Sequence, residues 1–75
     1  MESYSKIIEI RPYMRFGRPC IRDTRITVSD ILGWLGSGMS FDDVLSDFPE
    51  LCRSDIMACL MFAADRERRL HRLID

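Results

Sequence analysis

Two helix-start signals in the middle of the chain constrain the fold most. Thr27 is followed three residues later by Asp30, and Ser40 is followed at the same spacing by Asp43. In such a pair the hydroxyl and the carboxylate each accept a hydrogen bond from the other residue's backbone amide, which fixes the first turn of a helix. The sequence therefore predicts two helices that begin directly after Thr27 and Ser40.

Glycine and proline make both of these helices short. Gly36 and Gly38 end the first, because glycine adopts the left-handed conformation at a helix C-terminus without a steric penalty. Pro49 ends the second, because the residue before a proline is disfavoured in the α region. Together with the apolar spacing, these signals predict helices at about residues 28–36 and 41–48.

A third apolar stripe with helical spacing predicts a helix at about residues 54–72. The stripe consists of Ile56, Cys59, Leu60 and Ala63, and it resumes at Leu70, Leu73 and Ile74. Met57, Met61 and Phe62 lie off the stripe, so this helix has almost no polar face between Ile56 and Ala64. We therefore expect other protein surfaces to pack against this helix on two sides.

The first part of the chain, residues 1–27, predicts a small β and turn region. Ile7–Ile10 is a short β-branched run that Pro12 closes, which is typical of an edge strand. Turn residues bracket two further very short strands, around residues 20–22 and 25–27.

The predicted fold is mainly α, a three-helix, helix-turn-helix-like domain with a small N-terminal β element. Residues 1–75 are expected to form one domain, in which residues 28–75 are the three-helix bundle. A chain of this length buries only about 60% of its unfolded surface. We therefore expect a homodimer or a heteromeric partner to cover the third helix.

The charges are divided along the chain. Residues 1–29 carry a net charge of +3, residues 30–65 a net charge of −6, and residues 66–75 a net charge of +2. Arginines are candidates for nucleic-acid contact because they bind phosphates. These candidates are Arg15, Arg18, Arg22, Arg25 and Arg53. For the arginines of residues 1–29, ion pairs with nearby acids such as Asp23, a structural clasp of the dimer and contact with a partner are the alternatives.

The third helix itself is poorly suited to read DNA. A recognition helix presents Arg, Lys, Asn, Gln or Ser to base edges, whereas the first turns here offer Ser54, Asp55 and Met57. The apolar surface and the basic residues after Asp65 fit a protein partner better. The partner-binding candidates are Met57, Met61, Phe62, Arg66, Arg69 and Leu70. Asp65 and Arg69, and Glu67 and His71, are spaced to form ion pairs along the helix.

No catalytic or metal site is predicted. Cys20, Cys52 and Cys59 have no metal-binding spacing, and His71 is the only histidine. We expect small buried or half-buried thiols, no cofactor, no small-molecule substrate and no enzymatic activity. No apolar run approaches the ~18 residues of a membrane span, and the first ten residues lack a signal peptide pattern, so a cytoplasmic protein is expected.

Four stretches carry a resemblance to a known family. They are GRPCIRDTRI (17–26), SDILGWLGSGMS (29–40), DFPEL (47–51) and FAADRERR (62–69). Over about residues 7–70 the chain resembles a family of short bacterial and cyanobacterial proteins, the domain-of-unknown-function family four hundred and thirty-three. The resemblance implies a compact helix-turn-helix-like domain, commonly dimeric, that acts as a VapB-type antitoxin paired with a small toxin of PIN-like nuclease fold.

Two positions depart from the family pattern. Asp23 stands where the family often has glycine, and it tolerates a left-handed backbone better than most residues. Cys52 stands where a threonine often caps the third helix, which predicts a weakened start or a cap at Ser54.

Two functions remain as hypotheses. The first is an antitoxin-like module that neutralises a PIN-like nuclease toxin and also binds its own operator DNA. The alternative is a dimeric helix-turn-helix transcriptional regulator without a toxin partner.

Overall fold

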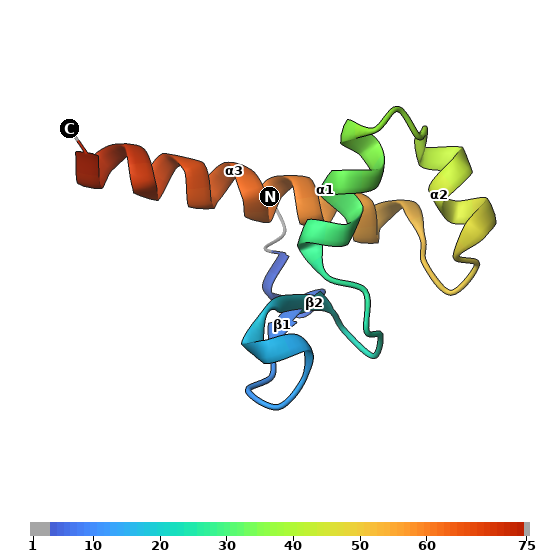
Figure 1. Ribbon diagram of the computed structural model, residues 1–75, viewed down its shortest axis with the longest axis horizontal. Coiled ribbons are helices and arrows are strands. Elements are labelled where there is room, and N and C mark those ends of the chain that lie inside the picture. Colours follow the sequence, from blue (N-terminus) through green and yellow to red (C-terminus); the bar gives the residue numbers. More distant parts are fainter. Residues whose placement is uncertain (1–3, 75) are drawn as a thin grey trace.

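A short β hairpin precedes three helices. The structure is a computed structural model that describes residues 4–74, with side chains up to residue 70. Strands β1 (Ile8–Ile10) and β2 (Pro19–Ile21) form the sheet, followed by α1 (Val28–Gly36), α2 (Phe41–Asp47) and α3 (Arg53–Ile74) (Figure 1). Single 3-10 turns, η1 (Tyr4–Lys6) and η2 (Arg15–Gly17), precede β1 and β2. The predicted mainly α fold with a small N-terminal β element is confirmed.

Both predicted capping boxes are present. The Asp30 amide donates to Thr27 Oγ1 at 2.9 Å, and the Thr27 amide donates to Asp30 Oδ2 at 3.1 Å. The corresponding distances between Asp43 and Ser40 are 3.0 and 2.9 Å. Helix α1 has the range that the sequence indicates, and α2 ends one residue earlier, at Asp47.

Helix α3 starts directly after Cys52. The Cys52 amide donates to Asp55 Oδ2 at 2.9 Å, which is half of a capping box. The predicted cap at Ser54 is therefore wrong, because the N-cap position is Cys52. There the Asp55 carboxylate accepts the hydrogen bond from the Cys52 amide. The helix continues to Ile74, two residues beyond the expected end.

The β region is smaller than expected. β1 and β2 pair antiparallel, with Ile8 opposite Ile21 and Ile10 opposite Pro19. The expected strand at residues 25–27 is only a single bridge between Thr27 and Cys20. A longer ladder does not form because the turn between Ile21 and Ile26 leads almost at once into α1.

The core lies where the three helices meet the hairpin. Ile31, Val44, Ile56 and Cys59 are completely buried, and they come from α1, α2 and α3. The hairpin and the segment after it contribute buried isoleucines to the same cluster, namely Ile8, Ile21 and Ile26. Cys20 and Cys59 are buried as expected, but Cys52 is exposed.

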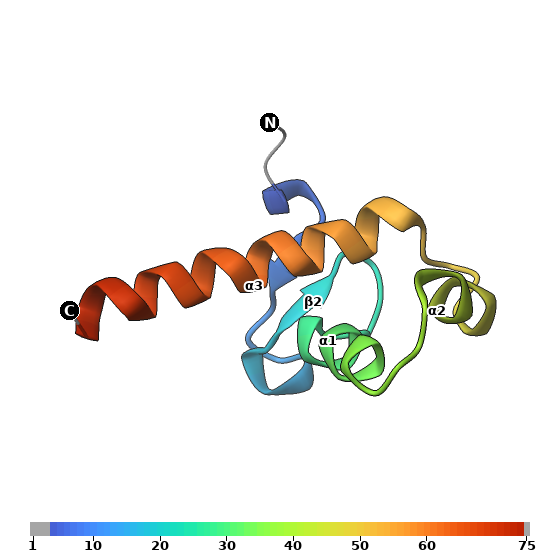
Figure 2. The same cartoon turned by 90° about the horizontal axis from the view of Figure 1, so that it is seen from above.

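Helix α3 extends beyond this core. Its N-terminal half packs across α1 and the hairpin, whereas the segment after Asp65 projects with no other element of residues 4–74 beside it (Figures 1 and 2). Among residues 4–74, no helix is long and apolar enough to cross a membrane. The fold thus displays two outlying regions, the loop between β1 and β2 and the projecting end of α3.

Candidate functional site

Two arginines fasten the loop between β1 and β2 to the neighbouring turn. Arg11 Nη2 donates to the carbonyl of Thr24 at 2.8 Å, and Arg11 Nε lies 3.2 Å from Glu9 Oε1. Arg15 Nη1 donates to the carbonyl of Arg25 at 3.2 Å, and its Nη2 lies 3.8 Å from Asp30 Oδ2. We call Arg11 and Arg15 the arginine clasp. Arg15 is a nucleic-acid candidate from the sequence, but here its guanidinium group holds the loop against the turn.

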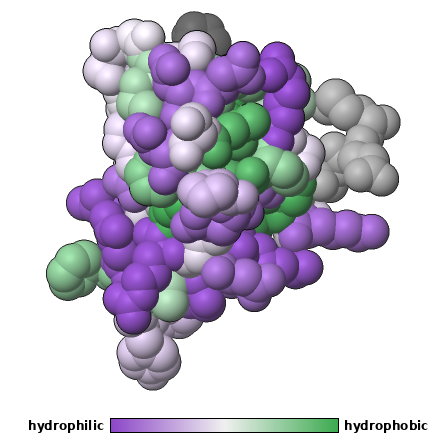
Figure 3. All heavy atoms as spheres, turned by 90° about the vertical axis from the view of Figure 1, so that its right-hand side faces the viewer, coloured by the Kyte–Doolittle hydropathy of each residue, from purple (hydrophilic) through white to green (hydrophobic). Residues whose placement is uncertain are grey.

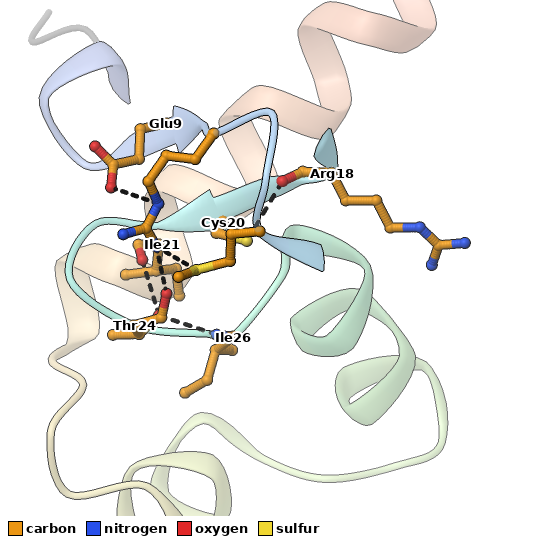
Figure 4. A network of polar contacts seen from close by, with 8 residues as sticks. Glu9, Arg18, Cys20, Ile21, Thr24 and Ile26 are labelled. Carbon is orange, nitrogen blue, oxygen red and sulfur yellow. Dashed lines mark hydrogen bonds and ion pairs between the residues drawn. The ribbon is translucent and has the colours of Figure 1, made fainter. Parts of the chain in front are cut away.

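The turn that the clasp holds is itself hydrogen-bonded. The Thr24 hydroxyl donates to the Ile21 carbonyl at 2.8 Å and accepts from the Ile26 amide at 3.0 Å (Figure 4). Asp23 has a φ of 63°, so the left-handed backbone expected at this position is confirmed. The signature from Gly17 to Ile26 therefore encodes a compact turn.

Three other arginines of this end are free. Arg18, Arg22 and Arg25 are exposed, and within residues 4–70 their guanidinium groups have no hydrogen bond or ion pair. The expected pairing with Asp23 is therefore wrong, since no ion pair among residues 4–70 includes Asp23. Figure 4 shows the Arg18 side chain extended away from the polar network.

The free arginines are spread over the end of the hairpin. Arg18 precedes β2 and Arg22 follows it, so their backbones are about 13 Å apart at the usual rise of a strand. The fifth nucleic-acid candidate, Arg53, lies elsewhere, with its guanidinium 4.8 Å from the centre of the Phe41 ring.

The loop also exposes two aromatic rings that the sequence interpretation missed. Tyr13 and Phe16 are fully exposed. Arg15, Phe16 and Gly17 have positive φ angles of 49°, 59° and 75°. The signal available in the sequence was the alternation of aromatic residues and arginines between Pro12 and Arg18.

The outward face of α3 is apolar. Met57 is 50% exposed and Leu60 is 37% exposed, while Met61 is half-buried. The assignment of Leu60 to the core stripe is wrong. Ala58 is buried instead, because the hairpin and η1 widen the covered side of the helix beyond a narrow stripe.

Phe62 is less available than predicted. Its ring packs edge to face against Tyr4 of η1, with centroids 5.4 Å apart and an interplanar angle of 77°. The Arg66 guanidinium lies 5.8 Å from the centre of the same ring. Periodicity within α3 does not reveal this cover, because Tyr4 comes from the opposite end of the chain.

Asp65 connects η1 to the start of the projecting segment. Tyr4 Oη donates to Asp65 Oδ2 at 2.7 Å, and Arg68 Nη1 donates to Asp65 Oδ1 at 3.1 Å. The expected partner Arg69 is exposed, and the Glu67–His71 pair lies outside the described side chains. The hydrogen bond to Asp65, with a contribution from burial, raises the pKa of Tyr4.

The remaining predicted partner residues lie on the projecting segment. Arg66, Arg69 and Leu70 are exposed, and Leu70 is 53% exposed. Basic and apolar side chains therefore occur together on the end of α3, which projects away from the other described elements (Figure 2).

The α2 end of the molecule is acidic. Figure 3 shows this end, where hydrophilic side chains surround an apolar area. Asp42, Asp43, Asp47 and Glu50 are exposed on α2 and the turn after it. These carboxylates would repel phosphates near the first turns of α3. The helix-turn-helix arrangement of α2 and α3 thus lacks the charge of a DNA-reading surface.

The described residues contain no group of three or more His, Cys, Asp and Glu side chains that could hold a metal ion. Burial raises the pKa of Cys59 to about 12, with a smaller effect of Asp55, so this thiol stays protonated at neutral pH.

These features define a small helical domain with a clasped β hairpin and a projecting third helix. The chain belongs to DUF433, a family described as proteins of unknown function, whose model matches residues 8–63. It is similar to the crystal structure of a DUF433 member protein from Anabaena variabilis ATCC 29413, with a TM-score of 0.79 and 26% identity. That similarity covers 91% of this chain and 67% of the other. The comparison with curated proteins gave no match.

Proposed function

We propose that this protein is a non-enzymatic antitoxin-type module in the cytoplasm, which docks through α3 on a small PIN-like nuclease. The observation that carries this proposal is α3 itself, because its outward face is apolar at Met57 and Leu60 and the projecting segment that follows is basic. The family description assigns no function, so the antitoxin role remains a prediction from the sequence resemblance.

The apolar part of the surface would supply docking energy. Met57 and Leu60 are partly exposed on the outward face of α3. A partner can cover the apolar surface that each of them exposes to water. Complete burial of a methionine or leucine side chain contributes about 1.5–3 kcal/mol. Methionine also adapts its shape to an irregular partner surface.

The basic part would supply the inhibition. Nucleases of this kind hold Mg²⁺ with carboxylates, and the planar donors of arginine bind carboxylates in pairs. Arg66 and Arg69 are exposed, and Arg69 is free of ion pairs within residues 4–70. In the complex these arginines bind the active-site carboxylates in place of Mg²⁺. They thereby also keep the phosphates of RNA out of the active site.

Without the toxin, we propose that a second copy covers the outward face of α3 and forms a homodimer. Light scattering of the purified chain should then give twice the monomer mass. Met57→Glu should return it to the monomer mass, because a buried unpaired carboxylate disfavours the interface. An unchanged dimer would place the contact elsewhere.

Co-expression with the product of the neighbouring gene tests the antitoxin role. We expect the two proteins to purify together and the nuclease to be inactive in the complex. Arg66→Ala with Arg69→Ala should restore nuclease activity, whereas Arg22→Ala, a free arginine on the hairpin, should not. Elution of this chain alone, with an active nuclease, would argue against the proposal.

A second function, binding of operator DNA, is favoured by the three free arginines of the hairpin end. We expect salt-dependent binding to duplex DNA that is lost when Arg18, Arg22 and Arg25 are changed to alanine. The absence of binding at ~50 mM salt would remove this function. A lower melting temperature as the only effect of the triple change would assign these arginines to stability.

A further inference from the structure

We infer that the loop between β1 and β2 binds single-stranded nucleic acid, with Tyr13 and Phe16 stacked on bases and the free arginines on phosphates. The inference goes beyond the two functions proposed above, because neither of them uses the aromatic rings. It also does not depend on the docking surface of α3.

The two rings have no role in folding that the structure shows. Tyr13 and Phe16 are fully exposed, and neither belongs to the side chains that pack against the core. The backbone at Phe16 is left-handed, with a φ of 59°, a conformation that is unfavourable for a residue with a side chain. The exposed ring adds no packing to the isolated chain, so an unfavourable backbone that displays it points to a ligand.

The loop holds the rings in a defined position. Three consecutive turn hydrogen bonds run through it: the Met14 amide to Arg11, the Gly17 amide to Met14 and the Arg18 amide to Arg15, at 3.0–3.1 Å. The arginine clasp ties the same loop to Thr24 and Arg25. A surface that is ordered before binding loses less entropy when the ligand arrives.

The positive charge of the arginines near the rings favours a polyanionic ligand. The clasp places Arg11 beside Glu9 and Arg15 beside Asp30, so these two carboxylates are already compensated. Within residues 4–70 the guanidinium groups of Arg18, Arg22 and Arg25 have no such partner. The acidic helix α2 lies on another side of the molecule in both views (Figures 1 and 2).

Aromatic rings beside free arginines fit a single strand better than a duplex. In a single strand the faces of the bases are open, and a ring can stack on any base while an arginine contacts the neighbouring phosphate. In a duplex the bases are stacked on each other, and an exposed phenyl ring has no comparable surface to cover. RNA and DNA single strands share this chemistry.

Fluorescence anisotropy with labelled strands tests the inference. The ligands are oligo-dT and oligo-U of about 12 nucleotides, within the usual size of a single-strand site, and a duplex of the same length. Poly-glutamate is the acidic peptide competitor. The protein variants are Tyr13→Ala with Phe16→Ala, and Arg18→Gln with Arg22→Gln and Arg25→Gln. Matched controls on α3 are Leu70→Ala and Arg69→Gln, which remove an exposed apolar and an exposed basic side chain.

The two kinds of variant should fail in different ways. Loss of both rings should weaken single-strand binding about 100-fold, which is about tenfold for each ring, and leave the salt dependence unchanged. Loss of the three arginines should lower the slope of log K against log salt by about 2, because each single-strand phosphate contact contributes about 0.7. Tyr13→Phe should retain binding, since the ring remains. A preference for oligo-U or for oligo-dT identifies the natural strand, and either supports the inference.

Four results would overturn the inference. The first is no binding of either single strand at ~50 mM salt, and the second is tighter binding of the duplex. The third is a loss of binding in the two control variants that is as large as in the ring variant. The fourth is displacement of the strand by poly-glutamate at equal charge concentration. The last result would indicate an acidic protein ligand. Circular dichroism of each variant should match the unchanged protein, because the substituted side chains are exposed.

Discussion

The loop between β1 and β2 and the projecting end of α3 are made from similar residues but are held in different ways. Both expose apolar side chains next to arginines. The loop is fixed by the arginine clasp and by turn hydrogen bonds, whereas the end of α3 has only its own helix and the contacts of Asp65. The loop is preorganised, whereas the end of α3 is ordered mainly by its own helical hydrogen bonds.

This difference suggests different modes of recognition. A fixed loop suits a ligand that is read by the position of a few rings and charges. A projecting helix suits a groove in a protein partner, where the helix gains the tertiary contacts that it lacks in the free chain.

The largest expected effect separates the two halves of α3. Ile56→Ala should lower the free energy of unfolding by about 2–5 kcal/mol, because Ile56 is completely buried and its loss leaves a cavity. Leu70→Ala should change it by less than about 0.5 kcal/mol, because Leu70 lies on the projecting segment. Urea denaturation of both variants measures the contrast. Equal losses would mean that the end of α3 is packed in solution.

A smaller effect is expected for the arginine clasp. Arg11→Met keeps an unbranched apolar side chain but removes the hydrogen bond to Thr24 and the ion pair with Glu9, so we expect a loss of about 1–2 kcal/mol. Arg18→Met, on the same loop, should cost less than about 0.5 kcal/mol, since Arg18 has no such bond. If the two variants unfold at the same urea concentration, the loop is not held by the clasp.

The effect expected at neutral pH is smallest for the thiols at the start of α3, because it appears only at alkaline pH. Cys52 is exposed and should react with iodoacetamide at pH 8, whereas the buried Cys59 should react only on unfolding. The pKa of Cys59 is raised from 9.0 to about 12, so between these values the unfolded chain loses a proton that the folded chain keeps. Stability should therefore decrease as the pH rises from about 9 to 12, and Cys59→Ala should reduce this slope. An equal rate for both thiols would contradict the burial of Cys59.

Local features of the fold could be predicted from the sequence. The starts of α1 and α2 depend on side chains three residues apart, so Thr27 and Ser40 identified them without knowledge of the remaining structure. The left-handed backbone at Asp23 followed from the same kind of local argument, combined with the family resemblance.

Features that depend on distant residues could not be predicted. The cover of Phe62 comes from Tyr4, and the restraint on Arg15 comes from the carbonyl of Arg25. Neither contact leaves a periodic signal along the chain. The arginines of the hairpin were treated as one group, but the structure divides them into a clasp and a free set according to which carbonyls lie within reach.

The hydrogen bond between Tyr4 and Asp65 also has a consequence for the order of folding. It joins positions that are 61 residues apart, so it closes a loop that includes almost the whole chain. The caps of α1 and α2 form between neighbours and need no such closure. During synthesis, the helix starts can therefore form early, while the segment around Tyr4 must wait until Asp65 has left the ribosome.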